Sequence, residues 1–283
     1  MQNTAHILAL ANGDRLDFTD RPAIMAIVNV TPDSFSDGGR YNTVEAAVAR
    51  AGECLAEGAG ILDVGGESTR PGHEPVTVEE ELRRVVPAVK AIHEAFPQAV
   101  ISVDTSKAPV ARGALAAGAQ IVNDVTALEH DGKEMAEALR DFHAPCILMN
   151  SVPIPPEKPF LQGLLEYLRK RLDWCCQASG LSAEHFALDP GIGFAKDLDQ
   201  NLACIAGLRE LSQLRRPMLI GPSRKSFLGL LTERQVGDRL AATVASVAVS
   251  AFEHADILRV HDVSAGVDAV RVATALAHSR SRL

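Results

Sequence analysis

Short apolar runs recur along the chain, and each one ends in a polar residue or a glycine. Each run is apolar almost throughout, which is typical of strands that are buried on both faces of a parallel sheet. The eight runs occupy residues 23–29, 60–65, 99–104, 120–124, 145–150, 185–190, 217–221 and 256–262. We expect each of them to form a β-strand.

The stretches between these runs have helical character. Residues 79–92 carry apolar side chains at Leu82, Val85 and Val89, which matches the repeat of an α-helix. Thr77 and Glu80 stand three residues apart at the start of this stretch, the spacing of a capping box.

Strand and helix therefore alternate eight times, which predicts an α/β fold, a (β/α)8 TIM barrel. A doubly wound open sheet is the alternative. It usually has fewer strands and often begins with a glycine-rich dinucleotide turn after its first strand, and this chain has no such turn.

The leading segment predicts a small addition to the barrel. Asn12-Gly13 lies between two short apolar runs, which is a strong signal for a β-hairpin. We expect this hairpin to cap the bottom of the barrel. No interior stretch resembles a linker, so we expect one domain over residues 1–283.

Composition narrows the range of partners. A net charge of −8 and an aromatic content of 4% argue against a nucleic-acid-binding protein. The longest apolar stretch without charges, residues 240–252, is too short to cross a bilayer. The five cysteines include no C-x-x-C pair, and the chain start is unlike a secretion signal, so we expect a cytoplasmic protein with reduced thiols.

Polar residues gather where the predicted strands end. In a (β/α)8 barrel these carboxyl ends meet at one rim, where active sites lie. Arg259 and His261 are two residues apart on the last strand, so they point the same way and suit an anion. The segment from Ser223 to Ser226 follows the seventh strand, a region where such barrels often bind phosphate. The polar residues of this rim are Asn29, Asp63, Asp104, Asn123, Asn150, Asp189, Arg259 and His261.

Several segments together resemble the dihydropteroate synthase family. They occur in the order typical of that family and extend over residues 24–263. The segments are AIVNVTPDSFSDGG (26–39), LDVGGESTRPG (62–72), SVDTSK (102–107), VNDV (122–125), LDPGIGF (188–194), GPSRKSFLG (221–229) and RVHD (259–262). Two of them, TPDSFSDGG and GGESTRPG, lie in long loops after the first and second strands, which suits closure over a substrate.

The resemblance implies a role for each residue that matches a family motif. It places the pterin ring against Asp104, Asn123, Met149, Asp189, Lys225 and Arg259. It places diphosphate against Asn29, Arg70, Arg259 and His261, with Mg2+ at Asn29 and Asp33 near the metal. It places p-aminobenzoate against Phe35, Thr69, Pro71, Phe194 and Ser223. The residues expected to act in catalysis are Asp33, Arg70, Lys225, Arg259 and His261.

The implied activity joins 6-hydroxymethyl-7,8-dihydropterin diphosphate to p-aminobenzoate and releases diphosphate, with Mg2+ as cofactor. We expect a carbocation-like step, in which the C–O bond breaks largely before attack and the pterin stabilises the cation. The weakly basic aromatic amine then needs orientation more than deprotonation. The resemblance also implies a homodimer. After the fifth strand the family usually has Met-His-Met, whereas this chain has Met149-Asn150-Ser151, which puts any role of the missing histidine in doubt.

Two other functions fit parts of this pattern. A barrel that transfers a methyl group from methyltetrahydrofolate to a corrinoid would share the Asp and Asn contacts, but would lack the two loop motifs. A pterin-binding paralogue with little activity would be expected to lose Lys225, Arg259 or His261, and this chain retains all three.

Overall fold

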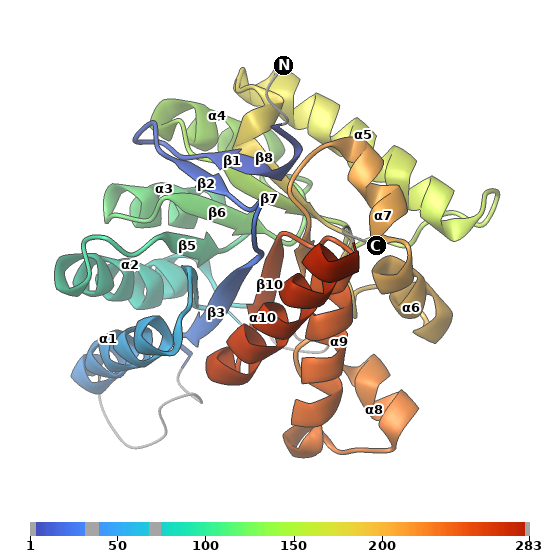
Figure 1. The fold of residues 1–283 in the computed structure, drawn as a ribbon. Coiled ribbons are helices and arrows are strands. Elements are labelled where there is room, and N and C mark those ends of the chain that lie inside the picture. Colours follow the sequence, from blue (N-terminus) through green and yellow to red (C-terminus); the bar gives the residue numbers. More distant parts are fainter. Residues whose placement is uncertain (1–3, 32–39, 68–74, 281–283) are drawn as a thin grey trace.

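The computed structural model describes residues 4–31, 40–67 and 75–280, and it confirms the predicted eight-stranded barrel (Figure 1). The strands run parallel in the order β8-β7-β6-β5-β4-β3-β10-β9. A parallel bridge between Leu188 and Met218 joins the two ends of this order, and the Leu188 N–H donates to the Pro217 carbonyl oxygen at 2.8 Å. The ring of strands is therefore closed.

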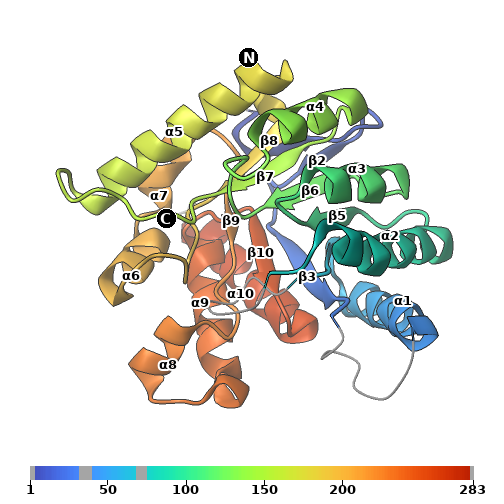
Figure 2. The same ribbon diagram turned by 180° about the vertical axis from the view of Figure 1, so that it is seen from behind.

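Helices alternate with the strands and surround them, as the two opposite views show (Figures 1 and 2). The strands are β1 (Ile7–Ala9), β2 (Arg15–Asp17), β3 (Ala23–Asn29), β4 (Ile61–Gly65), β5 (Ile101–Asp104), β6 (Ile121–Asp124), β7 (Cys146–Met149), β8 (Phe186–Asp189), β9 (Leu219–Ile220) and β10 (Ile257–Val260). The α-helices are α1 (Arg40–Glu57), α2 (Val78–Ala95), α3 (Ala108–Ala116), α4 (Gly132–Phe142), α5 (Phe160–Ser179), α6 (Leu198–Ala206), α7 (Leu208–Leu211), α8 (Ser226–Thr232), α9 (Leu240–Phe252) and α10 (Val263–Arg280).

The inward-facing side chains of the barrel change character along each strand. At the amino-terminal end, Met25, Ile61, Ile121, Ile147 and Ile257 form part of one buried apolar cluster. Two residues further along the same strands, the inward positions become polar or face the rim. On four of the five strands these positions are occupied by Asp63, Asn123, Met149 and Arg259, whereas β3 keeps the apolar Ile27. Since strand side chains alternate between faces, this step of two keeps both layers inside the barrel.

The hairpin β1–β2 seals the apolar end of the barrel, as predicted. Its register pairs Leu8 with Leu16, and Leu8, Leu10 and Phe18 join the interior cluster of the strands. The Leu10 N–H donates to the Asp14 carbonyl oxygen at 2.8 Å, so the turn holds three residues rather than the two of the tightest hairpins. Gly13 has φ +85, a left-handed conformation that glycine adopts without strain.

The helix predicted for residues 79–92 extends over Val78–Ala95, but its capping box is only half formed. The Thr77 hydroxyl accepts from the Glu80 N–H at 3.3 Å, as expected. The Glu80 carboxylate, however, accepts from the Arg84 Nε at 2.7 Å and from Arg83. These partners lie along the helix, so Glu80 is committed to ion pairs rather than to the backbone of Thr77.

The small apolar helix α9 packs against the barrel with one face, where Thr243, Val247, Ser250 and Ala251 are buried. The opposite side leaves Val249 50% exposed, and its neighbour α10 leaves Val272 59% exposed. Over the residues described, none of the helices combines the length and the apolar character that a membrane crossing needs.

Candidate functional site

The structure brings most of the predicted site residues to the carboxyl end of the barrel. Asn123, Met149, Asp189, Phe194, Lys225 and Arg259 line one pocket, together with Val125, Ile192 and Gly221. Asp104 also belongs to this group, because it is hydrogen-bonded to Arg259. Five predicted residues lie outside the described part of the chain, namely Asp33, Phe35, Thr69, Arg70 and Pro71.

Arg259 lines this pocket and is held by two carboxylates. Its Nε donates to the Asp63 Oδ2 at 2.6 Å, and its Nη2 donates to the Asp104 Oδ2 at 2.6 Å. Asn123 donates through its Nδ2 to the same Asp63 oxygen at 3.1 Å. Burial opposes the charge of Arg259, but Asp63 and Asp104 outweigh it and raise the pKa of the guanidinium. Arg259 is therefore a fixed cation at the base of the pocket.

Burial raises the pKa of two carboxyl groups at the pocket. Burial raises the pKa of Asp104 to about 7, although the charge of Arg259 acts in the opposite direction. Burial likewise raises the pKa of Asp189 to about 6, while the Gly191 N–H and the charges of Lys225 and Lys196 lower it. Shifts of this kind are common where buried groups take part in binding or catalysis.

Lys225 reaches the pocket from the residue that precedes α8. Its Nζ lies 4.1 Å from the centre of the Phe194 ring, a cation–π contact. The neighbouring Arg224 points away and forms a bidentate pair with Asp262, at 2.7 and 3.2 Å. Arg239 donates to the carbonyl oxygens of Arg224 and Lys225 at 3.1 and 3.3 Å. Of these two neighbouring cations, Arg224 therefore stabilises the fold, whereas Lys225 lines the pocket.

His261 and Ser223 form a hydrogen-bonded unit beside Arg259. The Ser223 Oγ accepts from the His261 backbone N–H at 3.2 Å and lies 3.0 Å from the His261 Nδ1. The family resemblance implies p-aminobenzoate beside Ser223 and diphosphate beside His261, and the structure places these two residues in contact. Asn29 ends strand β3, which pairs with both β10 and β4.

The loop after β8 depends on two glycines with positive φ. Gly191 has φ +76, and a Cβ at this position would lie 1.8 Å from the Asn150 carbonyl oxygen. Its N–H donates to the Asp189 Oδ1 at 2.7 Å, which orients that carboxylate. Gly193 has φ +80, and a Cβ there would lie 2.8 Å from the Cδ of Lys225. Both glycines therefore allow the close approaches that form the pocket.

Asn150 does not join the site, contrary to its place in the predicted rim. It is fully buried, and its Oδ1 accepts from the Lys196 Nζ at 2.7 Å while its Nδ2 donates to the Val152 carbonyl oxygen at 3.1 Å. Asn150 follows Met149 directly, so its side chain points to the opposite face of the strand. The departure from Met-His-Met thus lies outside the pocket, while Met149 lines it as predicted.

Lys107 of the SVDTSK motif is also structural. Its Nζ donates to the Glu81 Oε2 at 2.5 Å and to Glu67. The Glu67 Oε1 also accepts from the Val76 N–H at 3.3 Å. Lys107 therefore joins helix α2 to the segment that follows β4. This structural role accounts for a motif residue that does not line the pocket.

Sequence reasoning missed Asp63 as a partner of the pocket cation, although it recognised Asp63 as a polar strand residue. The available signal was its spacing. Asp63 follows Ile61 by two residues, so it shares the inward face of β4 with a core residue. An aspartate at such a position is costly unless it is paired with a cation.

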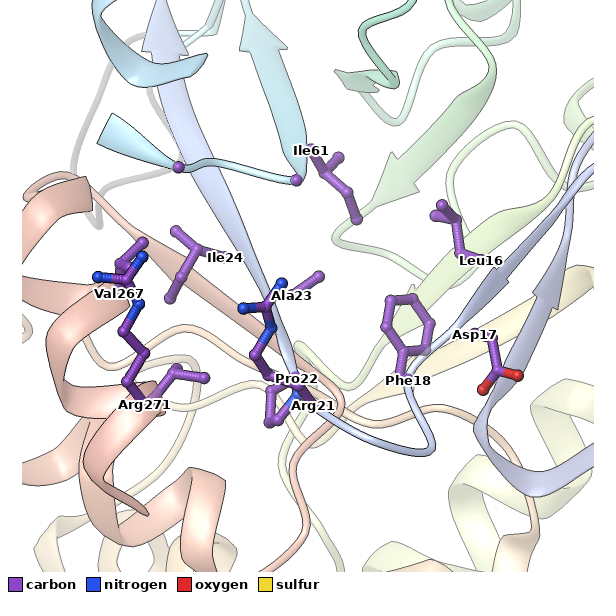
Figure 3. Close-up of a pocket in the computed structure, with 13 residues that line it drawn as sticks. Leu16, Asp17, Phe18, Arg21, Pro22, Ala23, Ile24, Ile61, Val267 and Arg271 are labelled. Carbon is purple, nitrogen blue, oxygen red and sulfur yellow. The ribbon is translucent and has the colours of Figure 1, made fainter. Parts of the chain in front are cut away.

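A second hollow, of about 280 Å3, lies at the opposite end of the barrel (Figure 3). Phe18, Ile24 and Ile61 line it, and Arg21 and Arg271 extend at its edge. It is larger than the space left at the rim. We nevertheless place the candidate site at the rim, because buried charged groups from several strands converge only there among the residues described, and barrel enzymes react at that end.

The rim pocket can recognise a flat ring that carries N–H groups and a carbonyl. Asp104 and Asp189 offer acceptors for N–H groups, and Lys225 offers a donor for a carbonyl oxygen. Arg259 and His261 add donors beside them for an anionic group. Such paired acceptors and donors bind a substrate in one orientation.

Comparison with known proteins agrees with this chemistry. The family model "Pterin binding enzyme" matches residues 25–261. The dihydropteroate synthase of Escherichia coli is 42% identical over 272 residues, which are 94% of this chain and 95% of that protein. The structure of Xanthomonas albilineans dihydropteroate synthase with 4-aminobenzoic acid has a TM-score of 0.87 at 43% identity, covering 96% of this chain and 98% of that one. The structure of the same enzyme with 7,8-dihydropteroate has a TM-score of 0.83 at 42% identity, with 94% and 97% covered.

Proposed function

The chain belongs to the dihydropteroate synthase family of pterin-binding enzymes, and from this premise we propose how its residues carry out the reaction. The activity is that of a transferase in folate biosynthesis. It joins the methylene carbon of 6-hydroxymethyl-7,8-dihydropterin diphosphate to the amino group of p-aminobenzoate. The products are 7,8-dihydropteroate and diphosphate.

One observation carries the residue assignment, which is that acceptors and cations from different strands converge at the rim. Asp104, Asn123, Asp189, Lys225 and Arg259 come from five elements that are far apart in the sequence, yet they line or contact one pocket. A structural core would not need this combination, because unpaired buried polar groups are costly.

The pterin ring binds first to the buried polar groups in this scheme. Asp189, oriented by the Gly191 N–H, accepts hydrogen bonds from the amino group and ring N–H of the pterin. Lys225 donates to the ring carbonyl, and Asn123 and Asp104 complete the contacts. Met149 packs against the ring, as an apolar side chain in the same pocket. These groups hold the methylene carbon toward the open end of the barrel.

Diphosphate lies toward Arg259 and His261. The Ser223 hydroxyl accepts from the His261 main chain and can donate to the His261 Nδ1, so the proton of the neutral ring is on Nε2, a suitable donor toward an anion. Arg259 and Arg70 add positive charge, which stabilises the departing diphosphate more than the bound substrate.

The residues fit a Mg2+ ion that is held mainly by the substrate. In the described part of the chain, no three carboxylate, imidazole or thiolate groups gather as a metal site. Asn29, at the end of β3, would supply the hard oxygen that Mg2+ prefers, since Mg2+ commonly binds through one or two protein oxygens plus phosphate. Asp33 would lie near this ion. When bound, Mg2+ supplies charge neutralisation at the diphosphate oxygens.

The chemical step follows from these positions. The bond between the methylene carbon and the diphosphate oxygen breaks, and its electron pair leaves with diphosphate. The pterin ring stabilises the resulting cation. The lone pair of the p-aminobenzoate nitrogen then forms the new C–N bond, and the nitrogen loses a proton. Phe35, Thr69, Pro71, Phe194 and Ser223 orient the p-aminobenzoate, which needs alignment more than deprotonation.

The assembly and the location are also part of the proposal. Apolar side chains on α9 and α10, including Val249, Val272 and Leu276, are 50–59% exposed and suit a contact between two copies. We therefore infer a homodimer of one-domain chains. We also infer that the protein acts in the cytoplasm, because all five cysteines are free thiols and four of them are buried.

The decisive experiment measures diphosphate release from the pterin diphosphate in the presence of p-aminobenzoate and Mg2+. We expect turnover that requires all three components. Binding of the pterin without turnover would instead favour a non-catalytic pterin-binding protein. Methyl transfer from methyltetrahydrofolate to a corrinoid would favour the methyltransferase alternative.

A further inference from the structure

Asp63 has a place in the structure that the proposed reaction does not explain. It lies in the middle of β4, faces the barrel interior and has no exposed surface. Its register partners are Ile27 and Ser102, whereas Asp104 pairs with Gly65, two residues nearer the rim. Asp63 is therefore one layer deeper than the carboxylate that we assign to the pterin.

At this deep position, Asp63 is hydrogen-bonded to two residues of the pocket. Its Oδ2 accepts from the Arg259 Nε at 2.6 Å and from the Asn123 Nδ2 at 3.1 Å. The Nε bond grips Arg259 close to its aliphatic stem, whereas the bond to Asp104 is made by the terminal Nη2. The two carboxylates thus hold different ends of one guanidinium.

The pocket beside Arg259 is too small for a pterin. The room that remains in the pocket is about 30 Å3, which is enough for about one or two water molecules. A two-ring pteridine is much larger than this. Some of the side chains that line the pocket must therefore move when the ring enters. Arg259 is one of these lining residues, and its terminal Nη2 is the group that bonds Asp104.

The interior below the pocket also has incomplete hydrogen bonding. Among the described residues, four buried side-chain atoms have no hydrogen-bond partner, and three of them are the Asp63 Oδ1, the Ser102 Oγ and the Asp104 Oδ1. Buried polar atoms are normally bonded, and exceptions cluster at sites with a function. The two carboxylates depend on the charge of Arg259, since two such groups side by side repel each other.

We propose that Asp63 is a positioning residue that anchors Arg259 in the empty barrel and serves as the fixed point about which its guanidinium turns when the pterin arrives. Arriving pterin displaces the Nη2 from Asp104, and this frees the Asp104 carboxylate for the ring. The Nε remains on Asp63, so the guanidinium turns toward the ring face and the diphosphate without leaving the pocket. This role rests on the proposed function, because it assigns Arg259 to the diphosphate.

Burial makes such an anchor effective. Charges attract more strongly inside a protein than in water, and the side chain of Asp63 is shielded from solvent completely. Removal of one member of a buried pair leaves the other uncompensated. Asp63 therefore acts through Arg259 rather than through the substrate, and its effect should depend on the presence of Arg259.

The test is a double-mutant cycle with Asp63→Asn, Arg259→Ala and the combined variant. Each is assayed for kcat and KM with the pterin diphosphate and for urea unfolding without ligand. We expect Asp63→Asn to lower kcat/KM at least ~10-fold, mainly through kcat. In the Arg259→Ala background the same change should alter kcat/KM less than ~3-fold, and it should not lower stability, because it then removes a carboxylate that repels Asp104.

Asp256→Asn is the matched control. Asp256 is also a buried carboxylate, and it accepts from the Met218 N–H at 2.8 Å at the far end of the barrel. We expect this change to affect unfolding but not kcat/KM. Equal losses from Asp63→Asn with and without Arg259 would overturn the proposal, and so would unchanged turnover in the single variant. The unfolding cycle tests the pair without catalysis, so an inactive parent protein would contradict the proposed function instead.

Discussion

Replacement of Asp189 by asparagine should make the empty protein more stable while it weakens pterin binding. Burial raises the pKa of Asp189 from 3.8 to about 6. At about 1.36 kcal/mol per pKa unit, ionised Asp189 costs ~3 kcal/mol in the folded state. Asparagine has the same shape without the charge, and its oxygen can still accept from the Gly191 N–H. The expected gain is therefore ~1–3 kcal/mol.

The stabilisation by Asp189→Asn must depend on pH, and the raised pKa of Asp189 determines the direction of this dependence. Asp189 is ionised in both the folded and the unfolded chain above about pH 6, so the full cost is present there. As the pH falls from 6 to 3.8, the folded state takes up the proton first and the cost disappears. Urea unfolding at pH 7.5 should thus show the stabilisation, and unfolding near pH 4 should show almost none.

Pterin binding should change in the opposite direction. Asparagine loses the charge that strengthens two hydrogen bonds from the ring, and each charged hydrogen bond is worth ~1.5–3 kcal/mol. We expect affinity to fall by at least ~100-fold, measured by isothermal titration calorimetry. A variant that is destabilised at pH 7.5, or a gain that is equal at both pH values, would refute the reasoning about burial.

Three further predictions concern the pocket and the barrel. Lys225→Ala should weaken pterin binding ~10–150-fold, measured by calorimetry, because a charged donor to the ring carbonyl is lost; unchanged affinity would show that Lys225 does not bind the ring. Gly191→Ala should strongly reduce the yield of folded protein, since its Cβ would lie 1.8 Å from the Asn150 carbonyl oxygen and its φ is +76; a normal unfolding curve would contradict this. Leu8→Ala should lower the free energy of unfolding by ~2–5 kcal/mol, because Leu8 is fully buried in the hairpin β1–β2 that seals the barrel. The kcat of this variant should equal that of the parent protein. A changed kcat would contradict the view that the hairpin β1–β2 stabilises the fold without affecting the rim pocket.

The architecture was largely predictable from the sequence, because buried parallel strands leave a clear trace. Each of the eight apolar runs contains an observed strand, and the hairpin closes the predicted end. The ends of the strands were less predictable. The run 217–221 contains only the two-residue strand Leu219–Ile220, because the length of a strand depends on its neighbours' hydrogen bonds rather than on its own residues.

The site was predictable as a set of residues but not as a set of contacts. Asn150 and Asp189 both end apolar runs, yet one faces away from the interior and pairs with Lys196 while the other lines the pocket. Side-chain direction depends on strand register, which a linear sequence does not fix. The spacing of Asp63 from Ile61 indicates an inward carboxylate that needs a cation, but its partner Arg259 is 196 positions away, and only the fold identifies it.

The change from apolar to polar side chains along the barrel strands has a consequence for protein engineering. Hydrocarbon residues near the hairpin form a buried cluster, while Asn123, Met149 and Arg259, two positions further along the same strands, line the rim pocket. A mutant library confined to these upper inward positions would explore new ligands while the lower layer keeps the scaffold intact. The protein can adapt to a competing inhibitor in the same way, because substitutions near the rim leave the lower apolar layer unchanged.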